Sequence, residues 1–179
     1  MTEKVNKLMR EIPALRWTAL ILLASMMFFA YMFVDVLSPL KTLLETERGW
    51  NSGAFGTEEG SEYFLNVFAF FLIFAGIILD KLGIRFTALL SAVIMILGAS
   101  IKYYAISDAF IGTGLETWLN SWWVDFPASA KLASLGFMIF GGGAEMAGIT
   151  VSKAIVKWFK GKELALAMGI EMAIARLGV

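Results

Sequence analysis

In the stretch Gly76-Ile-Ile-Leu-Asp80-Lys81-Leu-Gly83-Ile-Arg85, a short group of charged residues lies between two long apolar runs. The runs on either side of these charges, 63–79 and 86–101, contain no charged residue. A helix needs roughly 20 predominantly apolar residues, with about 17 at the lower end, to cross the hydrocarbon core of a bilayer. Each run reaches that length with a few flanking residues, so the stretch predicts two membrane helices joined by a tight turn.

Three further apolar runs, at 17–40, 132–152 and 164–179, occupy most of the remaining chain. The runs lack the alternation of a membrane β-strand, and a helix satisfies its own backbone hydrogen bonds in lipid. The first run is too long for the apolar core of a cleaved signal peptide, so we expect it to be retained. The sequence therefore predicts an all-α membrane protein with five transmembrane helices, at about 17–40, 62–79, 86–104, 132–154 and 164–179.

The composition excludes several classes of protein. Apolar residues make up 59% of the chain and charged residues 17%, against about 25% charged residues in soluble domains. Fifteen basic residues balance fifteen acidic ones, which argues against a nucleic-acid partner. The absence of Cys and His excludes disulfides, thiol nucleophiles, zinc clusters and histidine relays. We therefore expect that the protein is not an enzyme and that it binds no cofactor and no metal. We expect the lipid bilayer to be a partner.

The basic residues predict the orientation, because cytoplasmic loops of membrane proteins carry an excess of Lys and Arg. With a cytoplasmic N-terminus, the inner segments 1–16, 80–85 and 153–162 contain ten basic residues: Lys4, Lys7, Arg10, Arg16, Lys81, Arg85, Lys153, Lys157, Lys160 and Lys162. The outer segments 41–62 and 102–131 contain four: Lys41, Arg48, Lys102 and Lys131. We therefore expect a multi-pass membrane protein with its N-terminus in the cytoplasm.

The outer segments have two features of their own. Leu115, Trp118, Leu119 and Trp122 recur at helical spacing, which predicts a short amphipathic helix. Its indoles suit the headgroup layer of the membrane, and an aromatic cage for a solute is the alternative interpretation. The segment 49–60, with its glycines and two adjacent glutamates, is expected to be a solvated loop.

The charged stretch has the residues that a turn between two membrane helices needs. Gly83 permits a tight turn, and Gly76 permits the close approach of another backbone. Asp80 can accept hydrogen bonds from Arg85, or from the exposed N–H groups at the start of a neighbouring helix. The plainer interpretation is a basic inner turn in which these residues occur together by chance.

The stretch resembles the signature G-x3-D-[RK]-x-G-[x]-[RK], which members of the major facilitator superfamily carry between their second and third helices. Gly76, Asp80, Lys81, Gly83 and Arg85 occupy its positions. Further segments are similar to the branch that includes the animal lysosomal dipeptide transporters (major facilitator domain-containing protein type 1). These segments are 31–40 around Asp35, 141–145, 158–164 and 175–178.

The resemblance implies a secondary transporter of twelve helices in two six-helix halves, which moves a small solute by alternating access. Residues 1–179 then correspond to an incomplete N-terminal half, and the C-terminal half of the same transporter is an expected partner. The family's motif at Asp80 implies a conformational gate between the halves on the cytoplasmic side. Because the last run has about 16 residues where the sequence stops, we expect a fragment that does not transport by itself.

Four charged residues are expected at membrane depth: Asp35, Glu145, Glu171 and Arg176. A charge there costs about 2.5–3.5 kcal/mol on insertion scales, so such residues usually face a cavity or a partner. Glu171 and Arg176 lie about 140° apart on an ideal helix, which makes Glu145 the better partner for Arg176. All four are candidates for lining a substrate cavity. Alternatively, the Glu–Arg pair only fixes the register of two helices, and Asp35 only meets headgroups.

The fourth predicted helix differs from that of many proton-coupled members of the superfamily, which carry an arginine there. Glu145 is the only full charge of this helix within the membrane, which disfavours ordinary proton symport. We expect transport of a small organic solute, and the resemblance implies short peptides. Two alternatives stay open: a membrane protein with only a structural or assembly role, and an organic-anion transporter of the same superfamily, to which Arg176 points.

Overall fold

The computed structural model describes residue 9 and residues 11–179, and every regular element among them is a helix. The elements are α2 (Pro13–Val34), η1 (Ser38–Leu40), α3 (Lys41–Arg48), α4 (Ser52–Ser61), α5 (Phe64–Phe68), α6 (Phe71–Ile106), η2 (Asp108–Phe110), α7 (Gly114–Asn120), α8 (Ala128–Phe159) and α9 (Leu164–Arg176). The predicted all-α class is thus confirmed. Three of the described helical segments are long and apolar enough to cross a membrane, namely Pro13–Arg48, α6 and α8.

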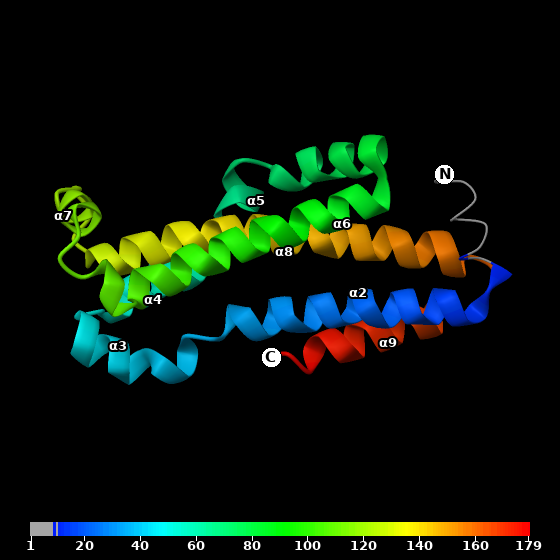
Figure 1. The fold of residues 1–179 in the computed structure, drawn as a ribbon, viewed down its shortest axis with the longest axis horizontal. Coiled ribbons are helices and arrows are strands. Elements are labelled where there is room, and N and C mark those ends of the chain that lie inside the picture. The colour runs from blue at the N-terminus through cyan, green and yellow to red at the C-terminus, as the bar shows by residue number, and fades with distance from the viewer. Residues whose placement is uncertain (1–8, 10) are drawn as a thin grey trace.

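The long element α6 contains a sharp reversal of the chain at Gly83. This residue has φ 83° and ψ 170°, a combination that is essentially restricted to glycine. The helical segments before and after it, 71–82 and 84–106, fold back on each other (Figure 1). The turn that the charged stretch predicts is therefore present, and it depends on the backbone freedom of one glycine.

The prediction of a solvated loop at 49–60 is wrong, because most of this segment forms α4. Asn51 caps the helix, its side chain accepting a hydrogen bond from the backbone N–H of Ala54 at 2.8 Å. Ala54, Phe55 and Glu58 are buried, and the helix packs against α8. Glycines lower the intrinsic helix propensity of the segment, and packing against α8 overrides that preference.

Three helices in succession, α4, α5 and the first part of α6, cover the region around the predicted helix 62–79. The helical path is interrupted at 62–63 and again at 69–70. Phe70 has a positive φ of 50°, which is rare for a bulky side chain. In secondary transporters such interrupted helices form solute and ion sites, so this region is a candidate for a solute site.

The α8 helix is the centre of the bundle, with α6, α4 and α2 packed against it. Leu20 of α2, Met95 of α6 and Phe137 and Phe140 of α8 are buried in one apolar core. The last helix, α9, runs alongside α2 (Figure 1). This arrangement matters for function, because it brings the ends of α2 and α9 close together.

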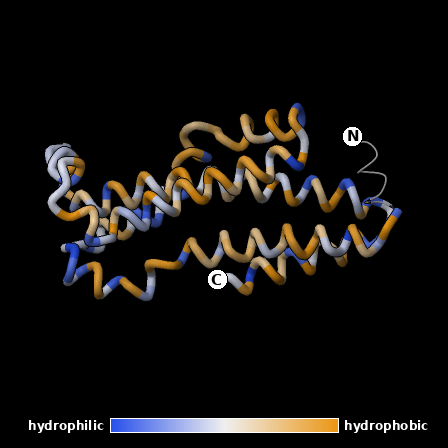
Figure 2. Tube along the Cα trace, in the orientation of Figure 1, coloured by the Kyte–Doolittle hydropathy of each residue, from blue (hydrophilic) through white to orange (hydrophobic). Residues whose placement is uncertain are grey.

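The two ends of the bundle are more hydrophilic than its middle (Figure 2). The turn at Gly83, the connection between α8 and α9, and the start of α2 lie at one end (Figure 1). These three segments are the ones predicted to face the cytoplasm. Lys4, Lys7 and Arg10, which contribute to that prediction, lie outside the described residues.

The structure places two features of the predicted outer segments. The amphipathic helix is confirmed as α7, although it ends at Asn120, and the ring of Trp118 lies with its centroid 4.8 Å from that of Trp122, just beyond the helix. Lys102 falls both in the outer segment 102–131 and in the predicted helix 86–104; it lies within α6, as the helix prediction has it, and is 1% exposed. An ion pair with Glu58 makes that burial possible.

Candidate solute-binding site

A cavity of about 160 Å³ lies between α2, the interruption after α4 and the middle of α8. Its wall is formed by Met27, Ala30, Tyr31 and Val34 of α2, by Glu62 and Tyr63 of the interruption, and by Ala144, Glu145 and Gly148 of α8. Two carboxylates and two phenol hydroxyls are thus set among apolar and small side chains. A concave, mainly apolar wall with a few convergent polar groups is typical of small-molecule sites.

A close backbone contact between helices brings the two carboxylates together. A Cβ on Gly141 of α8 would lie only 2.1 Å from the carbonyl oxygen of Glu62, so only glycine lets the end of α4 approach α8 this closely. Glu145 lies four residues further along α8, about one turn away on the same face. Glu62 and Glu145 therefore line the same cavity although they are far apart in the sequence.

The cavity wall is negatively charged. Glu62 is 8% exposed, Glu145 is half-buried, and neither forms an ion pair with a basic residue of the described chain. The lining includes no Lys or Arg. Within the described residues, no group of three or more His, Cys, Asp or Glu side chains could hold a metal ion.

The expected ion pair between Glu145 and Arg176 is absent from the described part of the chain. The guanidinium of Arg176 instead lies 5.7 Å from the ring centroid of Tyr31, a cation–π geometry. The reason is that α9 packs mainly along α2 rather than along α8. Arg176 is exposed and does not line the cavity itself. It adjoins the cavity because it lies over Tyr31, which belongs to the wall.

The two other predicted cavity residues do not line this cavity. Asp35 is exposed at the C-terminal end of α2. Glu171 is half-buried on α9. Of the four residues predicted from the sequence, only Glu145 lines the cavity, and Arg176 adjoins it.

Two ion pairs connect helices at the predicted cytoplasmic end. Asp80 pairs with Lys153 of α8, rather than with Arg85 as one prediction had it. Arg16 of α2 pairs with Glu163 at the start of α9, with 3.2 Å between Nη2 and Oε2. Both pairs hold the inner ends of the helices together. The remaining basic residues of the signature, Lys81 and Arg85, are exposed.

The predicted close approach of another backbone at Gly76 does not occur among the described residues. No heavy atom lies within 4 Å of the position that a Cβ would take there. The physical reason is that Gly76 faces away from the other helices of the described chain. The surface beside it is open to lipid or to a partner.

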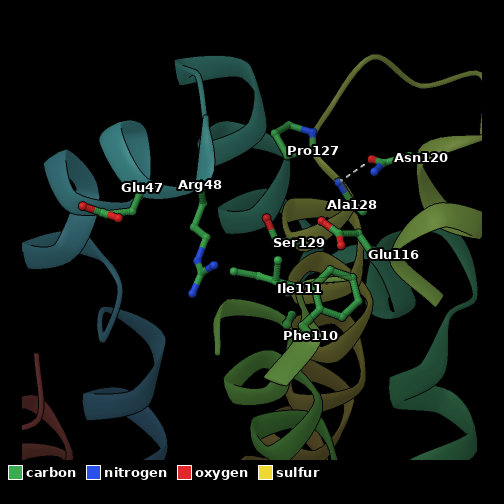
Figure 3. Close-up of a pocket in the computed structure, with 10 residues that line it drawn as sticks. Glu47, Arg48, Phe110, Ile111, Glu116, Asn120, Pro127, Ala128 and Ser129 are labelled. Carbon is green, nitrogen blue, oxygen red and sulfur yellow. Dashed lines mark hydrogen bonds between the residues drawn. The ribbon is translucent and has the colours of Figure 1, made fainter. Parts of the chain in front are cut away.

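A larger cavity of about 240 Å³ lies at the opposite end of the bundle, among α3, η2, α7 and the start of α8 (Figure 3). Two of its charged groups are already used within the chain: Arg48 donates to Asp108 at 2.6 Å, and Glu116 accepts a backbone N–H. Asn120 accepts a hydrogen bond from the N–H of Ala128 at 3.1 Å, across the edge of the same cavity (Figure 3). These contacts hold the segments at this end of the bundle to one another, so we take the cavity between α2 and α8 as the candidate solute site.

Sequence reasoning missed Tyr31, Glu62 and Tyr63 as cavity residues. The segment before Glu62 reads as a solvated loop because of its glycines, so a glutamate there attracts no attention. One signal was present: Glu58 and Glu62 are four residues apart, which places them on one face if the segment is helical. The cavity itself combines three distant segments and is not a property of any of them.

No family model matches the chain, and no solved structure matches it significantly. The chain is similar to the lysosomal dipeptide transporter MFSD1 of Mus musculus (28% identity), Homo sapiens (26%) and Danio rerio (27%). Each similarity covers 164 residues, which are 91% of this chain and 31% of the relative. The chain thus spans about a third of the length of these relatives. The similarity supports a membrane transporter, and the predicted resemblance to the branch of the major facilitator superfamily that includes the lysosomal dipeptide transporters is confirmed.

Proposed function

We propose that this chain is the N-terminal part of a secondary transporter, which moves small organic solutes such as short peptides by alternating access. The relatives are named for dipeptide transport, which supports the class of solute. The three long apolar helical segments support a position in the bilayer. In this proposal a second helical bundle, the C-terminal half of the same transporter, closes the open side of the cavity.

The observation that carries the proposal is the presence of an acidic and a basic side chain close to Tyr31. Glu145 lines the cavity together with Tyr31, and the guanidinium of Arg176 lies over the Tyr31 ring. A dipeptide carries an ammonium group at one end and a carboxylate at the other near neutral pH. In the proposed complex Glu145 accepts hydrogen bonds from the ammonium group, and Arg176 donates a bidentate pair to the carboxylate.

The inner end of the bundle supplies the proposed gate. Asp80 and Lys153 link the second and fourth predicted helices, while Lys81 and Arg85 are exposed beside them. We propose that these basic side chains meet the second bundle when the cytoplasmic side is closed. Rocking of one bundle against the other then exposes the cavity to each side of the membrane in turn.

Uptake into proteoliposomes tests the proposal, with the full transporter that contains this chain. Labelled alanyl-alanine, free alanine and succinate are offered separately, and initial rates are compared with those of protein-free vesicles. We expect saturable uptake of the dipeptide, and a loss of at least tenfold in kcat/KM in both Glu145→Gln and Arg176→Gln.

The matched control is Lys160→Gln, which removes one charge at an exposed position away from the cavity and is expected to leave uptake unchanged. Saturable uptake of succinate without uptake of the dipeptide would instead identify an organic-anion transporter. Uptake equal to that of protein-free vesicles for all three solutes would contradict the proposal.

A further inference from the structure

Two buried carboxylates and one buried lysine meet where α4 ends. Glu58 and Glu62 lie one helical turn apart, and they are 2% and 8% exposed. The ammonium of Lys102 lies 2.7 Å from Oε1 of Glu58 and 3.6 Å from the ring centroid of Phe137. The ammonium of Lys102 is ion-paired with Glu58 and also attracts Glu62 through space, while Glu62 forms no ion pair of its own with any described residue.

The carboxylate of Glu62 faces the cavity. Glu62 and Glu145 both belong to the wall, together with Tyr31 and Tyr63, and the hydroxyl of Tyr63 donates a hydrogen bond to Glu62. A buried carboxylate without a counter-charge is costly, because the low-dielectric surroundings do not replace its hydration. The lining includes no Lys or Arg, so the charge of Glu62 is neutralised either by a proton or by a cationic group that occupies the cavity.

We propose that Glu62 is a specificity-determining residue, which together with Glu145 holds a cationic ammonium group of the transported solute. This inference rests on the proposed function, because it assumes that the cavity is the solute site. It narrows the substrate class to solutes with a free protonated amine. Ala144 and Gly148 line the wall beside the two carboxylates and leave room for such a group.

The test compares two dipeptides that differ only at the amine: alanyl-alanine, and N-acetyl-alanyl-alanine, which keeps the carboxylate but has no ammonium group. Equilibrium binding to the purified full transporter is measured by titration calorimetry. We expect wild type to bind alanyl-alanine at least tenfold more tightly than the acetylated peptide. We expect Glu62→Gln to weaken binding of alanyl-alanine about tenfold and to leave binding of the acetylated peptide unchanged.

Glu59→Gln is the matched control, because it removes the same charge from an exposed position of α4, three residues before Glu62. It is expected to bind both peptides as wild type does. Glu62→Asp keeps the charge and is expected to retain part of the preference, which guards against a folding defect in Glu62→Gln. Thermal unfolding of each variant in detergent establishes that the compared proteins are folded.

Equal weakening of both peptides by Glu62→Gln, or no change for either, would overturn this inference while leaving the proposed function intact. Binding of both peptides that strengthens on acidification, and loses this response in Glu62→Gln, would overturn it in favour of a proton site. Failure of the wild-type transporter to bind or take up either peptide would contradict the proposed function itself.

Discussion

Lys102 illustrates at the residue scale how burial depends on partners. Its ammonium contacts the carboxylate of Glu58 and lies over the ring of Phe137. Both charged side chains are almost fully buried, which is tolerated only when the charges are paired. The pair therefore holds α4 against α6, and its removal is a sensitive test of this part of the fold.

Lys102→Met is expected to lower the free energy of unfolding by about 3–5 kcal/mol, because Glu58 is left buried without a counter-ion. The double variant Glu58→Gln, Lys102→Met removes both charges of the pair and should recover most of that loss. Guanidinium unfolding in detergent, followed by circular dichroism, measures both. Equal stability of the single and double variants would show that the pair is not the reason for the loss.

Asp80 belongs to an exposed ion pair and should matter little for stability. Its side chain is 77% exposed and that of Lys153 is 38% exposed, and such pairs contribute about 0–1 kcal/mol. If the proposed gate is right, Asp80→Asn shifts the full transporter between inward- and outward-facing states and leaves its affinity for alanyl-alanine unchanged. Cysteine accessibility from each side of the membrane measures the shift. A change in affinity alone would contradict the gating role.

At the element scale, the apolar runs predict most of the helices because the bilayer requires long apolar segments whose backbone is satisfied internally. The same reasoning fails at α4, where four glycines among residues 49–60 suggest a loop. Packing of Ala54 and Phe55 against neighbouring helices stabilises the helix there. Such packing is a tertiary effect, and nothing in the local composition signals it.

Substitution of Gly83 by alanine tests the turn between 71–82 and 84–106, and the same substitution at Gly76 is its control. Gly83→Ala places a side chain at φ 83°, and such strain costs on the order of 1–3 kcal/mol. Gly76→Ala adds a methyl group inside a helix with no described atom nearby, and should be neutral or stabilising by about 0.5–1 kcal/mol. Thermal unfolding in detergent compares them. Equal effects of the two substitutions would contradict the special role of the turn.

At the scale of the whole molecule, part of the solute site was predictable and part was not. Glu145 and Arg176 stand out in the sequence because charges are rare in membrane helices. The predicted ion pair between them is wrong, because α9 packs mainly on α2 rather than on α8. That preference depends on how all the helices pack together and cannot be deduced from the sequence of α9 alone. Glu62 and Tyr31 enter the site only through juxtaposition of distant segments, which the sequence does not reveal by itself.

The predicted topology has a direct test, because the chain contains no cysteine. Trp123→Cys introduces a thiol at a position that is 92% exposed, and Lys160→Cys introduces one at an exposed position in the connection between α8 and α9. We expect a membrane-impermeant maleimide added outside intact cells to label position 123 and not position 160. The reverse pattern would overturn the predicted orientation.

Counterflow through the full transporter is the most direct test of the proposed alternating access, because counterflow requires a site that opens to each side of the membrane in turn. Proteoliposomes are loaded with unlabelled alanyl-alanine and diluted into a trace of the labelled dipeptide. We expect transient accumulation of label above its external concentration, abolished by Glu145→Gln and retained by Lys160→Gln. Label that never exceeds the external concentration in wild type, or accumulation unaffected by Glu145→Gln, would contradict it.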